Sequence, residues 1–290
     1  MRIGFVGLGA MGRGLAGRLA GAGHTVRAWS RSARSRDLIP EGVVVVPKPL
    51  DLADSEVLIS MLAHDGAVRA VFLAEGLLAA LAPGTIHINM ATVSVDLARD
   101  LAKLHEARGA AYVASPVLGR PDAAAEGRLH LLVAGPAAAI TRLEELWAVL
   151  GQRVWRFGER PESANAVKIA TNLTLACAIE AMGEAAGLAG AYGVEAGPYL
   201  DMLTQTLFSS PAFKLYGALI AEDRFEPPGF RLALGLKDVN LALEAGAEAA
   251  MPLPFGAVLR DRFLDCVAHG EEGRDWCALV MAGRRQAGRA

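Results

Sequence analysis

Hydrophobic and polar positions in the first half of the chain follow two alternating patterns. Short runs rich in β-branched residues predict strands, and apolar residues at helical spacing between several of them predict amphipathic helices. Strands that alternate with helices indicate βαβ units and a mainly parallel sheet. The predicted strands are Arg2–Val6, Thr25–Trp29, Val43–Val46, Val57–Ser60, Thr85–Asn89, Ala111–Ala114, His130–Ala134 and Val154–Arg156, and the predicted helices are Met11–Ala22, Ser94–Arg108 and Ala137–Leu150.

The strand pattern stops after about Gly158, and the rest of the chain is helical in pattern. Residues 163–191 predict one long helix rich in Ala, Leu and Met, and further helices are separated by breaks at Pro227–Phe230 and Met251–Pro254. The fold class is therefore α/β. We expect a mainly parallel sheet domain over residues 1–160, followed by an all-helical domain over residues 161–290 that a long interdomain helix enters.

Three glycines follow the first predicted strand, at the start of the first predicted helix, in the pattern G-x-G-x-x-G. The first allows a tight turn, the second lets a pyrophosphate approach the backbone, and the third lets helix and strand pack closely. The helix N-terminus then offers free N–H groups to the phosphates. This context predicts a Rossmann-type dinucleotide site, the alternative being a tight strand–helix turn without a ligand. The residues of the predicted site are Gly7, Leu8, Gly9, Ala10, Met11 and Gly12.

The end of the second predicted strand indicates which dinucleotide binds, because an acid there would hold a ribose 2′-hydroxyl. The sequence has Ser30, Arg31 and Ser32 at this place and no acid. Two hydroxyls and a guanidinium suit a 2′-phosphate, and Arg34 and Arg36 add positive charge nearby. The sequence therefore favours NADP(H) over NAD(H); the alternative is that these arginines only solvate a surface loop.

Lys168 stands just before eleven uncharged residues, Ile169–Ile179, which indicate a buried helix face. Asn172, four positions later, points the same way. A buried cation must be paired or functional, because its desolvation is costly. Next to a nicotinamide, an ammonium can protonate a carbonyl oxygen as hydride reaches the carbon, and burial lowers the lysine pKa from about 10.4 towards a working range. The alternative is a lysine that reaches from the helix into solvent.

Composition narrows the class of protein further. The 290 residues are 53% hydrophobic with a formal net charge of -2, which indicates a globular chain and no electrostatic preference for nucleic acid or an anionic membrane. Ile169–Ile179 is too short to span a bilayer, and the N-terminus lacks the pattern of a signal peptide. Three cysteines without paired spacing suit the cytoplasm, and six scattered histidines predict no metal site.

The ordered set of motifs resembles the β-hydroxyacid dehydrogenase family, with 3-hydroxyisobutyrate dehydrogenase, tartronate-semialdehyde reductase and glyoxylate/succinic-semialdehyde reductase among its members. The resemblance covers nearly the full chain: GFVGLGAMG, Met61-Leu62, Thr92 within INMATVS, SPVLGRPDAAAEGRLHLLVAG, Lys168-x-x-x-Asn172 and Lys237-Asp238. It implies a Rossmann domain of the 6-phosphogluconate dehydrogenase type, an all-helical domain, and homodimers or homotetramers. It also implies that Lys168 is catalytic, that Asn172 binds substrate, and that Met61, Leu62, Thr92 and Lys237 line the cofactor.

One stretch departs from the family, whose usual substrate loop has the sequence D-A-P-V-S-G-G. The serine and second glycine that commonly help hold a substrate carboxylate are Leu118 and Arg120 here. Leu118 removes a hydroxyl and adds bulk, while Arg120 either replaces the carboxylate contact or points to solvent. The candidate substrate contacts are Ser115, Leu118, Gly119, Arg120 and Asn172.

These features predict a cytoplasmic NADPH-dependent oxidoreductase that interconverts a small semialdehyde or keto acid and the hydroxy compound, with Lys168 as general acid and base. Two alternatives stay open. One is a reductase of cyclic imines or bulky non-acid ketones on the same scaffold, although relatives that reduce imines generally lack the catalytic lysine. The other is a non-catalytic NADP-binding module.

Overall fold

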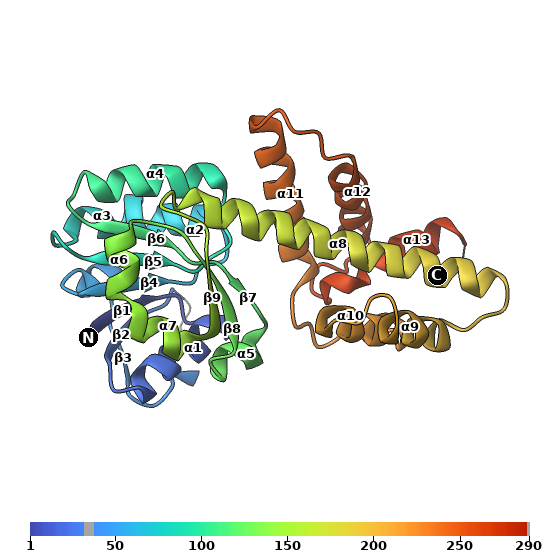
Figure 1. The fold of residues 1–290 in the computed structure, drawn as a ribbon, viewed down its shortest axis with the longest axis horizontal. Helices are drawn as coiled ribbons and strands as arrows, with labels where there is room; N and C mark the ends of the chain where they lie inside the picture. Colours follow the sequence, from blue (N-terminus) through green and yellow to red (C-terminus); the bar gives the residue numbers. More distant parts are fainter. Residues whose placement is uncertain (32–37, 289–290) are drawn as a thin grey trace. The chain divides into compact units, whose positions relative to one another are not determined.

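The computed structural model describes residues 1–31 and 38–288. They form two compact units, Met1–Lys168 and Ile169–Ala290, and each is described by itself (Figure 1). The units divide two helical turns after the boundary expected at 160/161. The reason is that Ala164 lies in a hydrophobic core cluster of the first unit, and the Asn165 side-chain amide donates to the Val93 carbonyl oxygen.

A six-stranded, fully parallel sheet forms the centre of the first unit, with the strand order β3-β2-β1-β4-β5-β6. Strands β2 and β3 extend the sheet on one side of β1, and strands β4, β5 and β6 extend it on the other, as in a doubly wound sheet. The sequence patterns placed these strands within one residue at each end. The strands are β1 (Arg2–Val6), β2 (Thr25–Trp29), β3 (Val43–Val45), β4 (Val57–Ser60), β5 (Ile86–Asn89) and β6 (Ala111–Ala114).

A second, three-stranded sheet follows in the same unit. β8 (Leu129–Val133) pairs antiparallel with β7 (Val117–Leu118) and parallel with β9 (Gly151–Arg156). The last two predicted strands therefore pair with each other outside the six-stranded sheet. The sequence analysis did not predict β7, because two residues are too few for a periodic pattern.

Helices cover both faces of the six-stranded sheet. Alternate residues of each strand enter opposite clusters: Phe5 and Ile59 pack with α1 and α7, whereas Val6 and Leu58 pack with α3 and α4. The predicted helix over 137–150 is interrupted at Leu143. The helical segments are α1 (Ala10–Gly21), η2 (Pro49–Leu52), α2 (Asp65–Arg69), η3 (Ala70–Ala74), α3 (Leu77–Ala80), α4 (Val95–Glu106), α5 (Pro121–Ala125), α6 (Ala137–Arg142) and α7 (Glu144–Leu150).

The second unit is helical and has its own core, which includes Ile179, Phe263 and Trp276. Both predicted breaks fall between its helices. The buried Asp275 carboxylate accepts hydrogen bonds from the backbone N–H groups of Gly229 and Phe230, which fixes the loop before α11. The helices are α8 (Glu162–Ala191), which begins in the first unit, α9 (Ala196–Gln205), α10 (Pro211–Ala221), α11 (Leu232–Glu248), α12 (Pro254–Ala268), η4 (Trp276–Leu279) and α13 (Val280–Gln286).

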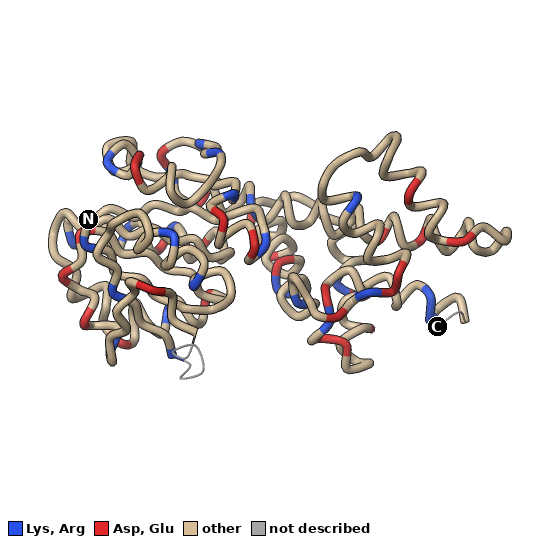
Figure 2. Tube along the Cα trace, turned by 90° about the horizontal axis from the view of Figure 1, so that it is seen from below, with Lys and Arg blue, Asp and Glu red and all other residues tan. Residues whose placement is uncertain are grey.

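Helix α8 is 30 residues long and is apolar enough to meet the length and hydropathy criteria for crossing a membrane. Long core helices of water-soluble proteins meet the same criteria. Only 28% of its most apolar window is buried within the chain. The helix also carries Glu180, which forms an ion pair with Arg262, and Figure 2 shows acidic and basic residues interspersed along both units.

Two buried histidines, His87 of β5 and His105 of α4, form a chain of hydrogen bonds. The Nδ1 of His105 lies 2.7 Å from the Leu101 carbonyl oxygen and therefore carries the proton. Its Nε2 then accepts from His87 Nδ1 at 2.9 Å, and His87 Nε2 accepts from the Ser60 hydroxyl at 2.8 Å. Burial lowers the pKa of His105 to about 4 and holds the pKa of His87 well below its usual value. Both rings are therefore neutral in the folded protein at neutral pH.

We expect this pair to make the fold acid-sensitive. Because the folded-state pKa values lie below the unfolded value of about 6.5, the unfolded chain binds more protons between that pH and about 4. The contribution to stability is complete above pH 6.5 and falls by about 1.4 kcal/mol per pH unit for each histidine as the pH drops. Urea unfolding midpoints between pH 4.5 and 7.5 measure this. His105→Asn should flatten the slope, and His269→Asn, at an exposed ring, should not; equal slopes would contradict the expectation.

Candidate active site

Five strands of the six-stranded sheet end side by side. Trp29, Val6, Ser60, Asn89 and Ala114 pair in one continuous register across β2, β1, β4, β5 and β6. The segments that follow these residues therefore leave the sheet at one carboxyl edge, where ligands bind in open parallel sheets. The structure brings to this edge the predicted site residues Gly7, Ser30, Arg31, Met61, Leu62, Thr92 and Ser115.

The glycine turn shows a separate role for each of its three glycines. Gly7 has φ +103°, and a Cβ there would lie 2.4 Å from the Met61 carbonyl oxygen. A Cβ on Gly12 would lie 1.9 Å from the Gly7 carbonyl oxygen, so the turn closes only over a glycine. A Cβ on Gly9 would meet no atom of the described residues within 4 Å. Space next to the Gly9 backbone is thus open, as an approaching pyrophosphate requires.

The start of α1 fits a dinucleotide phosphate. Gly9 is the N-cap residue, no side chain caps it, and the first turn contains no acidic residue. The first-turn N–H groups and the positive end of the helix dipole therefore suit an anion. Leu8 has its side chain fully buried in the core, so only its backbone can contact the cofactor, whereas Ala10 is exposed and Met11 half-buried.

The residues predicted to choose between the two dinucleotides are only partly described. Ser30 is 8% exposed and Arg31 is exposed, directly after the end of β2. Ser32, together with Arg34 and Arg36, lies outside the described residues. Of these three arginines, Arg31 is the one that the structure describes, and it lies next to the expected ribose position.

The segments that carry Met61, Leu62 and Thr92 are tied to each other. The Met90 N–H donates to the Ser60 carbonyl oxygen at 2.8 Å, and the Asp65 carboxylate accepts from the Ser94 N–H at 3.0 Å. Asn89 Oδ1 also accepts from the Ala91 N–H, which shapes the turn before Thr92. These bonds hold the three predicted cofactor contacts beside the glycine turn.

The predicted substrate loop begins at the same edge. Ser115 is fully buried, and its N–H donates to the Asn89 carbonyl oxygen at 2.8 Å. Its hydroxyl is buried and has no hydrogen-bond partner among the residues described, which is unusual for a buried polar group. Leu118 is half-buried in β7, Gly119 has φ +143°, and Arg120 is half-buried as the residue before α5.

The first turns of α8, which carry Lys168, are tied to this edge. The lysine is half-buried, and Asn165, one turn before it, donates from Nδ2 to the Val93 carbonyl oxygen at 3.4 Å. Asn165 is 1% exposed, and its Oδ1 lacks a partner within the described part of the chain. The sequence analysis did not single out this asparagine, although a polar residue on an apolar helix one turn before Lys168 was a usable signal.

In the second unit, a buried carboxylate holds two of the predicted site residues. Asp238, 2% exposed, accepts from Asn172 Nδ2 at 2.5 Å, and its other oxygen lies 2.7 Å from Lys237 Nζ. Breaking a buried charged pair leaves an uncompensated charge, so Asp238 stabilises the orientation of both side chains. The sequence analysis included Asp238 in a family motif and assigned it no role.

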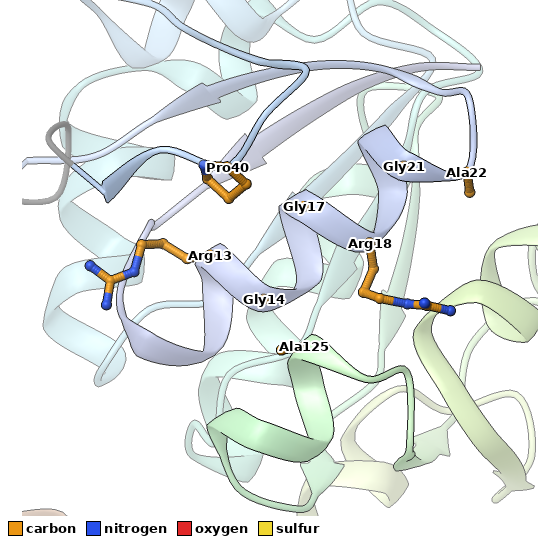
Figure 3. A pocket seen from close by; sticks show the side chains of 8 residues that line it. All are labelled: Arg13, Gly14, Gly17, Arg18, Gly21, Ala22, Pro40 and Ala125. Carbon is orange, nitrogen blue, oxygen red and sulfur yellow. The ribbon is translucent and has the colours of Figure 1, made fainter.

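The described residues also show how far the chain meets the requirements of a pocket and of a metal site. A cavity of about 560 Å³ follows the outer face of α1, where Gly14 and Gly17 let Ala125 and Pro40 pack closely; none of the predicted site residues that the structure describes lines it (Figure 3). Within residues 1–31 and 38–288, no three His, Cys, Asp or Glu side chains gather as a metal site would require.

Comparison with known proteins agrees with this architecture. Residues 2–158 match the family described as the NAD-binding domain of 6-phosphogluconate dehydrogenase, and residues 163–282 match the NAD-binding family of NADP-dependent 3-hydroxyisobutyrate dehydrogenase. The uncharacterized oxidoreductase YfjR of Bacillus subtilis is 38% identical, over 97% of this chain and 99% of that protein. The 2-hydroxy-3-oxopropionate reductase of Escherichia coli is 30% identical, over 97% of each chain.

Solved structures extend the comparison. Mycobacterium tuberculosis 3-hydroxyisobutyrate dehydrogenase with L-serine has a TM-score of 0.87 at 29% identity, over 98% of this chain and 99% of that one. Psf3 in complex with NADP+ scores 0.84 at 25% identity, over 96% and 99%. A reductive aminase from Aspergillus terreus with NADPH scores 0.61 at 25% identity, over 98% and 99%. The chain therefore belongs to the β-hydroxyacid dehydrogenase family of NAD(P)-dependent oxidoreductases that act on CH–OH groups.

Proposed function

We propose that the protein is an NADPH-dependent reductase of a small semialdehyde or keto acid, with Lys168 as the proton donor. The observation that carries the proposal is the docking of the Lys168 turn of α8, through Asn165, onto the Val93 segment at the carboxyl edge. The glycine turn, Met61, Leu62 and Thr92 are at that same edge. The neighbours with reductase and dehydrogenase names support the reaction type.

The residues of this chain have separate tasks in the proposed reaction. The glycine turn and the start of α1 would hold the pyrophosphate, and the bound nicotinamide supplies the hydride. Lys168 donates a proton to the carbonyl oxygen during reduction, and the neutral amine takes the proton back from the alcohol in the reverse direction. Ser115, whose hydroxyl has no hydrogen-bond partner among the described residues, and Asn172, held by Asp238, are the proposed substrate ligands.

NADPH is the proposed cofactor, and Arg31 is the residue that tests it. Arg31→Ala should weaken NADPH binding about tenfold or more while NADH binding changes little, because only NADPH carries the 2′-phosphate that a guanidinium pairs with. Dissociation constants for both dinucleotides, measured by nicotinamide fluorescence, give the ratio. Arg27→Ala, at an arginine of β2 that pairs with Asp54, is the matched control. Equal losses for the two dinucleotides in Arg31→Ala would contradict the assignment.

Reduction of cyclic imines or bulky ketones is the second candidate. It is favoured by Leu118, which replaces a hydroxyl with bulk in the substrate loop, and by the similarity to a reductive aminase. Initial rates with NADPH on succinic semialdehyde, glyoxylate and a cyclic imine separate the candidates. We expect turnover of the two aldehydes. An imine-only result would favour the second candidate, and NADPH binding without turnover of any carbonyl or imine would favour a binding module.

We also propose a cytoplasmic homodimer or homotetramer, as the family resemblance implies. Sedimentation velocity of the purified chain measures the oligomeric state, and a concentration-independent monomer would contradict this part of the proposal.

A further inference from the structure

The three-stranded sheet has one face in the core and one face that bears polar and aromatic groups. Leu129, Leu131 and Val133 of β8 enter the core, so His130 between them points to the other face. The register places Leu118 of β7 opposite His130, and His130 opposite Arg153 of β9. Leu118, His130 and Arg153 thus form a row across three strands, about 10 Å long at the usual strand spacing. The row starts at the substrate-loop position where this chain departs from its family.

Arg153 on this face is a cation stacked on an aromatic ring. Its guanidinium carbon lies 3.9 Å from the centre of the Trp155 ring. Among the residues described, no carboxylate lies within 4.0 Å of Arg153. A guanidinium stacked on an aromatic ring keeps its N–H edge free for a planar anion and is only weakly hydrated. Arg153 is therefore oriented for an anion, and the described part of the chain does not supply one.

His130 and Trp155 complete the surface. The indole Nε1 donates to His130 Nδ1 at 3.4 Å, and the Gln152 amide nitrogen lies 3.2 Å from His130 Nε2. Trp155 remains 39% exposed, which leaves part of its ring for contact with a ligand. Leu118 adds an apolar contact at the other end of the row. The combination suits a molecule with an apolar body and an anionic end.

We propose that Leu118, His130, Arg153 and Trp155 form a subsite for the far end of the substrate, and that this end carries a carboxylate or a phosphate. The inference rests on the proposed function, because the near end is the carbonyl that Lys168 protonates. In this arrangement Arg153 contacts the anion in place of the serine hydroxyl that the family's usual loop has at position 118. The anion then lies on the other side of the three-stranded sheet's row, at β9. The substrate class is then a semialdehyde or keto compound whose anionic group lies several carbons from the reacting carbon.

The test compares two arginines of the same strand in the full-length protein. Arg153→Gln removes the proposed contact, and Arg156→Gln is the control, because Arg156 points to the opposite face and pairs with Glu144. Substrates are succinic semialdehyde and butyraldehyde, which differ at the far end by a carboxylate against a methyl group. We expect Arg153→Gln to raise the KM for succinic semialdehyde about tenfold or more and to leave the KM for butyraldehyde unchanged. Equal changes for both aldehydes, or an equal effect of Arg156→Gln, would overturn the subsite.

A binding measurement keeps the subsite testable if the proposed reaction fails. Titration of the protein with 4-hydroxybutyrate or with an alkyl phosphate should change the tryptophan fluorescence in a saturable way, whereas 1-butanol should not. The fluorescence change should disappear in Trp155→Phe. In Arg153→Gln the dissociation constant of the anion should rise about tenfold. A preference for one of the two anions identifies carboxylate or phosphate as the class. Saturable binding without turnover of any aldehyde would refute the reaction and retain the subsite; binding that is unchanged in Arg153→Gln would refute the subsite.

Discussion

Lys168→Ala is expected to lower kcat for aldehyde reduction by at least about 10²-fold, because general acid catalysis by a positioned side chain contributes about 10²–10⁴. The dissociation constant of NADPH should change little, since the glycine turn and the start of α1 are untouched. Steady-state kinetics with saturating NADPH, and separate fluorescence titrations of NADPH, measure the two quantities.

Two further variants decide what Lys168 supplies. Lys168→Arg keeps the charge, but a guanidinium does not give up its proton near neutral pH, so kcat should stay as low as in the alanine variant. Lys103→Ala, at an exposed lysine of α4, should leave kcat unchanged. Wild-type turnover in Lys168→Arg would assign an electrostatic role in place of proton transfer, and near-normal turnover in Lys168→Ala would remove the lysine from the mechanism.

Two glycine variants should separate folding from cofactor binding. In Gly12→Ala the new methyl group would lie 1.9 Å from the Gly7 carbonyl oxygen, so the turn cannot close and both the melting temperature and NADPH binding should fall. In Gly9→Ala the methyl group meets no atom within 4 Å in residues 1–31 and 38–288. The melting temperature should therefore stay unchanged, while NADPH binding weakens about tenfold or more because the methyl group occupies the space of the pyrophosphate.

Thermal unfolding without cofactor and NADPH titration give both quantities for each variant. Gly21→Ala, where a Cβ also meets no described atom within 4 Å, is the matched control from the end of α1; it should not lower the melting temperature and should leave the affinity unchanged. Wild-type affinity in Gly9→Ala would place the pyrophosphate away from the glycine turn. That result would overturn the cofactor site, whereas a lower melting temperature in Gly9→Ala would contradict the open space seen beside it.

Local features of the sequence located most of the candidate site. Gly7, Gly9 and Gly12 follow a strand and open a helix, and this spacing alone indicated the turn that the structure contains. The strands that end at Ser60 and Asn89 were also visible as apolar runs, so the segments carrying Met61 and Thr92 followed from strand order. Partners far apart in the chain were harder to foresee. Asn165 with Val93 and Asp238 with Asn172 are each brought together by tertiary packing, and one polar residue in a helix does not reveal which distant group it contacts.

The sequence by itself determined the parallel βαβ unit, the glycine turn and the long helix that carries Lys168, because these depend on periodicity and backbone conformation within a few residues. Only the tertiary structure decided that β7 exists and that Leu118, His130 and Arg153 form one row across three strands. The physical reason is that strand pairing is set by hydrogen bonds between segments far apart in the chain. A two-residue strand has no periodic pattern of its own, so its partners determine both its presence and the face on which its side chains lie.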